Sequence, residues 1–106
     1  MMNLQKEIAN WFEREWGGAL LFPDGWFGRP FDNQHMLNEI KEKNGALELS
    51  LDDGLLLRFH GLKNVKDSGK ELRFSNFEKC EFNWNREENP MIYQDGEIKV
   101  VASSVS

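Results

Sequence analysis

Cysteine is almost absent from this chain of 106 residues, because Cys80 is the only one. A single cysteine excludes an internal disulfide and a cysteine-based metal cluster. No hydrophobic run is long enough to span a membrane, and residues 1–8 lack the apolar core of a signal peptide. These absences predict a cytoplasmic protein without a membrane partner.

Positive charge is also scarce. Thirteen lysines and arginines stand against eighteen aspartates and glutamates, which gives a formal net charge of −5. An acidic chain without a basic run repels phosphate backbones and anionic lipid surfaces. We therefore expect no nucleic-acid partner, and the partner class that best fits this charge is a protein.

The length is that of one domain, which we expect to cover residues 1–106. Residues 3–16 are predicted to form an amphipathic helix with an apolar stripe that includes Ile8, Trp11 and Phe12. Asn3 can cap its start, and the glycines at 17–18 can end it. The bulky stripe predicts that the helix packs on a sheet.

After residue 35 the apolar period changes from helical to alternating, which is typical of half-buried strands. Residues 36–102 are therefore predicted to form an antiparallel meander of about seven to eight short strands that curls toward a partial barrel. Together with the helix this predicts an α+β fold. Around the turn at 52–54, Leu49 is expected to pair with Leu57 and Leu47 with Phe59, because this register places their side chains on one face.

Three further turns suggest hairpins. The Asn44-Gly45 turn would pair Ile40 with Leu49, although residues 33–43 could instead form a short helix ended by Gly45. The turn at 68–69 would pair Val65 with Leu72. The turn at 95–96 would pair strand 91–93 with strand 98–100, and thus Tyr93 with Ile98.

Residues 20–35 form a predicted aromatic loop, since no helix or strand favours their mixture of glycine, proline, aromatic and charged side chains. As a recognition loop, it would offer flat apolar faces, a guanidinium and a carboxylate. As a structural loop, it would cap the open end of the sheet. The candidate binding residues are Trp26, Phe27, Arg29, Asp32 and His35.

No catalytic residue is assigned. His35 and His60 are the only histidines, and neither has the spacing of a metal motif, so we expect no metal and no cofactor. Cys80 alternates with Phe82 and Trp84 on the predicted inward face, where a thiol acts as a small apolar residue. Phosphate-binding and dinucleotide motifs are not present in the sequence.

The run from Asp24 to Pro30, Asp-Gly-Trp-Phe-Gly-Arg-Pro, followed by Asp32-Asn33, resembles a signature of small uncharacterised bacterial proteins. In those proteins it precedes a strand-rich segment similar to residues 47–61. The resemblance covers about half the chain. It implies a bacterial, cytoplasmic origin and no particular activity.

Three function classes fit these observations. The first is a small, acidic, non-catalytic domain that binds a protein partner through its acidic surface and aromatic loop. The second is a small-ligand binding module, and the third is a small hydrolase that uses Asp32 and His35. We favour the first class, because no catalytic constellation is found.

Overall fold

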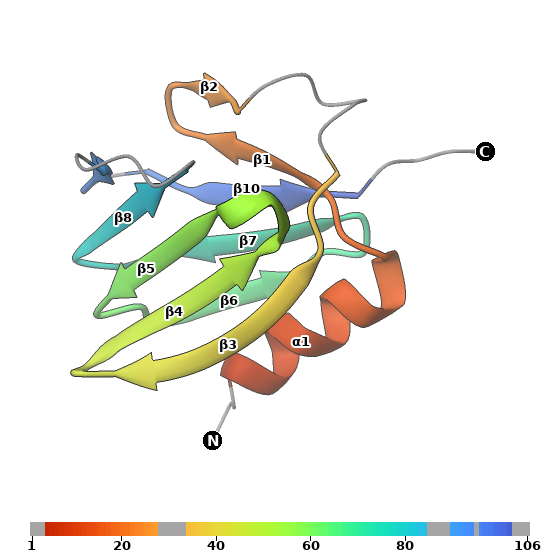
Figure 1. The fold of residues 1–106 in the computed structure, drawn as a ribbon, viewed down its shortest axis with the longest axis horizontal. Helices are drawn as coiled ribbons and strands as arrows, with labels where there is room; N and C mark the ends of the chain where they lie inside the picture. Colours follow the sequence, from red (N-terminus) through yellow and green to blue (C-terminus); the bar gives the residue numbers. More distant parts are fainter. Residues whose placement is uncertain (1–3, 28–33, 85–89, 95, 103–106) are drawn as a thin grey trace.

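The computed structural model describes residues 4–27, 34–84, 90–94 and 96–102, and these form one helix and two antiparallel sheets (Figure 1). The helix is α1 (Leu4–Glu15). The first sheet has the strand order β2 (Gly25–Trp26), β1 (Ala19–Phe22), β10 (Ile98–Val101), β7 (Glu71–Ser75) and β6 (Asn64–Asp67). The second sheet has the order β3 (Leu37–Lys43), β4 (Ala46–Leu51), β5 (Leu56–His60), β8 (Lys79–Asn83) and β9 (Met91–Tyr93). The fold is α+β, as expected.

The two sheets pack face to face and share one hydrophobic core. Phe59 of β5 stacks on Phe74 of β7, with ring centroids 4.7 Å apart. Phe22 of β1 contacts Phe82 of β8 at 4.7 Å. The expected partial barrel is wrong, because the sheets are not closed on each other. The described residues hold ten strands rather than seven or eight.

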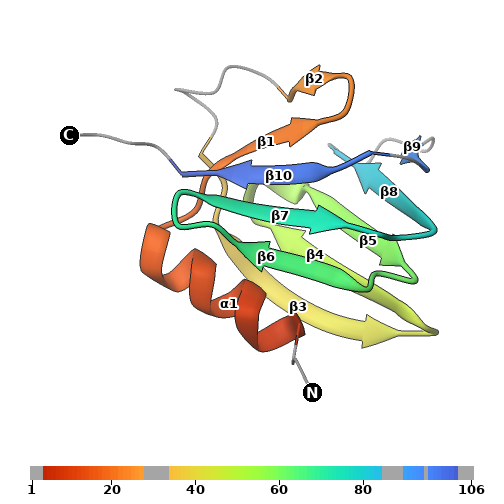
Figure 2. The ribbon, with the colours of Figure 1, turned by 180° about the vertical axis from the view of Figure 1, so that it is seen from behind.

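The helix lies along one open side of this pair of sheets (Figure 2). It contacts the edge strands β6 and β3, one from each sheet. Ile8, Trp11 and Phe12 are buried, so the predicted apolar stripe is confirmed. The helix packs on the sheets as expected, but at their edges, where α1 closes the gap between β6 and β3.

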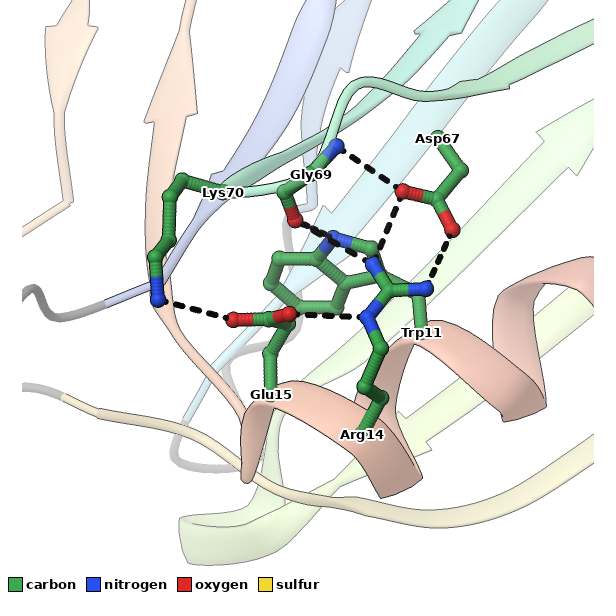
Figure 3. Close-up of polar contacts among 6 residues, drawn as sticks. All are labelled: Trp11, Arg14, Glu15, Asp67, Gly69 and Lys70. Atoms are coloured by element: carbon green, nitrogen blue, oxygen red, sulfur yellow. Dashed lines mark hydrogen bonds and ion pairs between the residues drawn. The ribbon is translucent and has the colours of Figure 1, made fainter.

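Polar contacts fasten α1 to the β6–β7 hairpin (Figure 3). The Trp11 indole Nε1 donates to the Gly69 carbonyl at 2.9 Å. The Arg14 guanidinium donates two parallel hydrogen bonds of 2.8 Å to Asp67, and it also contacts Glu15. The hydrogen bonds from Arg14 lower the pKa of the Asp67 carboxyl. These contacts set the position of the helix along the sheet edges.

Several predicted pairs are present. Leu49 pairs with Leu57 and Leu47 with Phe59, while Ile40 pairs with Leu49 across the turn at 44–45. The alternative helix at 33–43 is wrong, since residues 37–43 form β3. Matching the inward residues of neighbouring strands was sufficient to predict the register of these hairpins, because each turn is short and the strands are adjacent in sequence.

The predicted register at 68–69 is wrong by two residues. Val65 pairs with Phe74, not with Leu72. A shift of two leaves every side chain on its expected face, so the alternating pattern does not distinguish the two registers. The Asp67 carboxylate, which accepts from the Gly69 backbone N–H at 3.0 Å and from Arg14, favours the observed turn.

The predicted hairpin at 95–96 is also wrong. Tyr93 pairs with Cys80 of β8, and Val100 pairs with Leu20 and Leu72 of the other sheet. The chain therefore crosses from the second sheet to the first between β9 and β10, and the strands do not form a simple meander. The expected aromatic loop likewise begins too early, because residues 19–22 form β1 and residues 25–26 form β2.

Two glycines with similar backbone angles provide a test of the helix–strand junction. Gly17 has φ +87°, and a Cβ there would lie 2.2 Å from the His35 carbonyl oxygen. Gly45 has φ +79°, and no described atom lies within 4 Å of such a Cβ. Gly45→Ala should cost about 1–2 kcal/mol from backbone strain alone. Gly17→Ala should cost clearly more, as measured by urea unfolding, and equal losses would contradict the close approach.

Candidate functional site

A half-open cleft with a volume of about 210 Å³ lies between the two sheets on the side opposite α1. On that side the edge strands are β2 in the first sheet and β9 in the second. The lining residues are Phe22, Asp24, Gly25, Trp26, Phe27, Phe82, Trp84, Met91 and Tyr93. We call this site the aromatic cleft.

The cleft is formed by rings that also extend the core. Phe22 stacks on Tyr93 at 4.8 Å, with planes only 10° apart. Phe82 stacks on Trp84 at 5.5 Å, and Phe27 meets Phe82 edge to face at 5.0 Å. Phe22 and Phe82 are buried, so they fix the ring positions from beneath. Such stacked and edge-to-face pairs hold aromatic side chains in defined orientations.

A polar pair lies at the rim of the cleft. The Tyr93 hydroxyl donates to Asp24 Oδ1 at 3.2 Å, and this contact joins β9 to the β1–β2 turn. Burial raises the pKa of the Tyr93 phenol to about 12, and the negative charge of Asp24 acts in the same direction. At neutral pH the phenol is therefore a donor. Among the described lining residues, Asp24 is the only acidic side chain, and it is exposed.

The Tyr93 contact predicts a titration that can be followed without labels, because Tyr93 is the only tyrosine. Its phenolate absorbance should appear with a midpoint near pH 12, against about 10 in urea-unfolded chain. The folded pKa is raised, so the associated stability is present below about pH 10 and is lost as the pH rises through 12. Asp24→Asn should lower the midpoint, and a native midpoint near the unfolded value would contradict this environment.

The structure separates the sequence-predicted site residues. Trp26 lies at the cleft rim with 43% of its surface exposed, while Phe27 is half-buried and points into the ring cluster. Arg29 and Asp32 lie outside the described residues. Trp26 and Phe27 thus share one site, with Trp26 available to solvent and Phe27 bound to the core.

His35 has a different environment. It is only 3% exposed, and its Nδ1 lies 3.0 Å from Asp52 Oδ1. Its backbone N–H donates to the Gly18 carbonyl at 2.8 Å. These contacts join the start of β3 to the β4–β5 turn and to the segment before β1. The imidazole ring centroid lies 6.0 Å from that of Phe27, so His35 supports the cleft from its buried side.

Cys80 and the second histidine, His60, have structural environments. Cys80 is buried, and burial raises the pKa of its thiol, which makes it a poor nucleophile. His60 Nε2 lies 2.6 Å from Glu81 Oε2 on the outer face of the second sheet, and this hydrogen bond lowers the pKa of Glu81. Within the described ranges, no group of three or more His, Cys, Asp or Glu could hold a metal ion.

Of the nine described lining residues, sequence reasoning named only Trp26 and Phe27 as binding residues, and it did not foresee the contributions of Tyr93, Met91 and Asp24. Tyr93 and Met91 were expected to pair with residues 98–100, and Asp24 was not among the candidate binding residues. The two β9 residues face the cleft because β9 pairs with β8 in the second sheet. No local pattern in the sequence predicts that β9 pairs with β8. The only signal for a site in this segment was its short run of large apolar and aromatic residues, Met91 to Tyr93.

Trp16 is a second exposed aromatic, at the far end of α1 from its start. It is 77% exposed and has φ +62°, where its backbone N–H donates to the Phe12 carbonyl at 3.0 Å. The left-handed backbone at this position ends the helix one residue before Gly17. Trp16 does not line the aromatic cleft.

No family model matches the chain, and no curated protein or solved structure shows significant similarity to it. The resemblance of the segment from Asp24 to Asn33 to small bacterial proteins therefore stays a prediction. None of the described helices is long and apolar enough to cross a membrane.

Proposed function

We propose that this protein is a non-catalytic interaction domain that binds a protein partner at the aromatic cleft. The observation that carries the proposal is a half-open cleft of aromatic side chains at an edge of the sheets, with Trp26 and Met91 exposed at 43% and 39%. Aromatic side chains and methionine are enriched at the centre of protein interfaces, where they contribute most of the binding energy. A partner side chain inserted here would contact rings held rigidly by the core.

The volume of the cleft favours a partner side chain over a free small molecule. Small-molecule sites commonly have volumes of roughly 300–1,000 Å³ and enclose most of their ligand. The aromatic cleft has about 210 Å³ and is open on one side. It suits one side chain that stays attached to a larger surface. A small-ligand module remains the second candidate, because the cleft is a half-open hollow lined by aromatic side chains.

The hydrolase hypothesis relies on Asp32 and His35, and His35, the one that the structure describes, gives it no support. A general base must reach the proton that it takes from a substrate or water. His35 is 3% exposed and has its Nδ1 against Asp52, so a substrate has no direct access to it. The resemblance to small bacterial proteins supports a bacterial, cytoplasmic setting for the interaction domain.

The test is affinity capture from an extract of the source cells, with quantitative mass spectrometry of the retained proteins. The cleft variant combines Trp26→Ala with Met91→Ala, and Trp16→Ala is the matched control at another exposed tryptophan. All three side chains are exposed, at 43%, 39% and 77%, so both variants should keep their melting temperatures. The proposal predicts a partner retained by the wild type and by Trp16→Ala, and reduced about tenfold or more by the cleft variant.

Two outcomes would contradict this proposal. A partner lost with Trp16→Ala and kept by the cleft variant would place the contact surface near the end of α1. A small molecule that co-purifies with the wild type, is absent from the cleft variant and is detected by native mass spectrometry would favour the ligand-binding module.

A further inference from the structure

The described lining of the aromatic cleft carries negative charge only. Asp24 is the only charged side chain among the described lining residues, because the Tyr93 phenol is neutral at pH 7 and none of these residues is a lysine or an arginine. The one described polar contact of Asp24 is the Tyr93 hydroxyl, so its carboxylate has no described cation as a partner. Asp24 is exposed at the rim, so its carboxylate can accept a charge-assisted hydrogen bond from a cationic ligand in addition to the one from Tyr93.

The aromatic rings of the cleft also favour a cationic ligand. The face of an aromatic ring carries partial negative charge, which attracts a cation within about 6 Å of the ring centroid. Tyr93, Phe27 and Trp84 are all half-buried at the cleft, so each presents part of its ring surface to it. Stacking holds Tyr93 and Trp84 in place before binding, and an edge-to-face contact with Phe82 holds Phe27, so little freedom is lost when a ligand enters.

We infer that the aromatic cleft binds a cationic side chain, lysine or arginine, that a basic protein partner inserts between the rings and the Asp24 carboxylate. The inference rests on the proposed function and adds the chemistry of the partner. The aliphatic stem of such a side chain would lie on Met91 and the rings, and its charged head would reach Asp24 at the rim. The net charge of −5 on the whole chain complements a basic partner and would speed their encounter.

A titration followed by NMR tests the charge requirement with defined probes. Nα-acetyl-lysine amide and Nα-acetyl-arginine amide are compared with Nα-acetyl-norleucine amide, which has a lysine-like stem without the charge. The signals to follow are the indole N–H groups of the tryptophans, with Trp16 as the internal control outside the cleft. Lysine or arginine amide should shift the Trp84 and Trp26 signals, and norleucine amide should bind at least about tenfold more weakly.

Two charge variants separate a local contact from a general electrostatic effect. Asp24→Asn removes the cleft carboxylate and keeps a hydrogen-bond acceptor for Tyr93. Glu13→Gln removes an exposed carboxylate of α1 and changes the net charge equally. The inference predicts that Asp24→Asn weakens binding of the lysine amide several-fold, leaves norleucine amide unchanged, and has a much larger effect than Glu13→Gln.

Each contrary result has a distinct meaning. If norleucine amide binds as tightly as lysine amide, the cleft takes an apolar side chain, so the inference is wrong while the proposed function stands. Equal effects of Asp24→Asn and Glu13→Gln would also overturn the inference, because the carboxylate would act only through net charge. If no probe shifts the Trp84 signal, the inference is wrong, and the proposed function is decided separately by the capture experiment.

Discussion

Replacing Phe59 with alanine is expected to lower the free energy of unfolding by about 3–5 kcal/mol, as large aromatic truncations in cores do. Phe59 is fully buried in β5 and stacks on Phe74 of the other sheet at 4.7 Å, with planes 15° apart. It also meets Phe77 edge to face at 5.5 Å. The variant would therefore leave a cavity at the junction of the two sheets. Urea unfolding followed by tryptophan fluorescence gives the loss.

Leu56→Ala is the matched control for this prediction. Leu56 lies on the same strand but on the outer face, where its side chain is only half-buried. Its truncation should cost less than about 1 kcal/mol. Similar losses for Phe59→Ala and Leu56→Ala would mean that the first and second sheets do not pack through Phe59. A domain of this size commonly has a stability of about 5–15 kcal/mol, so the Phe59 loss alone could unfold much of the population.

The second large effect is expected at the helix. Trp11→Ala should lower the free energy of unfolding by about 3–5 kcal/mol, because Trp11 is fully buried where α1 closes the gap between β6 and β3. Trp11→Phe keeps much of the ring and removes the Nε1 donor to Gly69, so it should cost about 1 kcal/mol. The Gly69 carbonyl still accepts from Arg14 at 3.2 Å, which limits that loss.

Asn10→Ala is the control within the same helix, since Asn10 is exposed beside Trp11. Its effect should stay within about 0.5 kcal/mol. Urea unfolding of Trp11→Ala, Trp11→Phe and Asn10→Ala, each compared with the wild type, measures these three losses. If Trp11→Ala and Asn10→Ala had similar effects, the helix would not contribute to the core, and the sheet edges at β6 and β3 would need another cover.

The two open sides of the sheet pair differ in how they are covered. On one side α1 covers the edges β6 and β3 with Trp11 and with its polar contacts to the β6–β7 hairpin. On the other side the edges β2 and β9 are separated by aromatic side chains, and the cleft remains open. A partner that fills this cleft would complete the burial of rings such as Phe27 and Trp84, which are half-buried in the free protein.

Local elements were the part of the fold that the sequence predicted best. The helical stripe of Ile8, Trp11 and Phe12 is buried as expected. The register of the β3–β4–β5 segment followed from matching alternating leucines across short turns, with Leu49 beside Leu57. Both inferences depend on side chains close in sequence, whose relative positions are set by the geometry of one helix or one hairpin.

The candidate site was predictable only in part, because it joins segments distant in sequence. Trp26 and Phe27 were recognised from their unusual neighbours, and both line the cleft. Tyr93 comes from β9, and Trp84 is the residue after β8. The predicted hairpin at 95–96 placed Tyr93 beside the wrong strand. An alternating strand shows which of its faces is apolar, but it does not show which sheet it joins.

The sequence by itself thus determined the α+β class, the acidic charge, the helix and the central hairpins, since these depend on periodicity and composition. The tertiary structure decided which strands share a sheet, where α1 packs and which aromatics meet. It did so because two sheets with equivalent apolar faces can accept any of these strands locally. Only the simultaneous packing of one core, with Phe59 on Phe74 and Phe22 on Phe82, selects a single arrangement and leaves the cleft between β2 and β9.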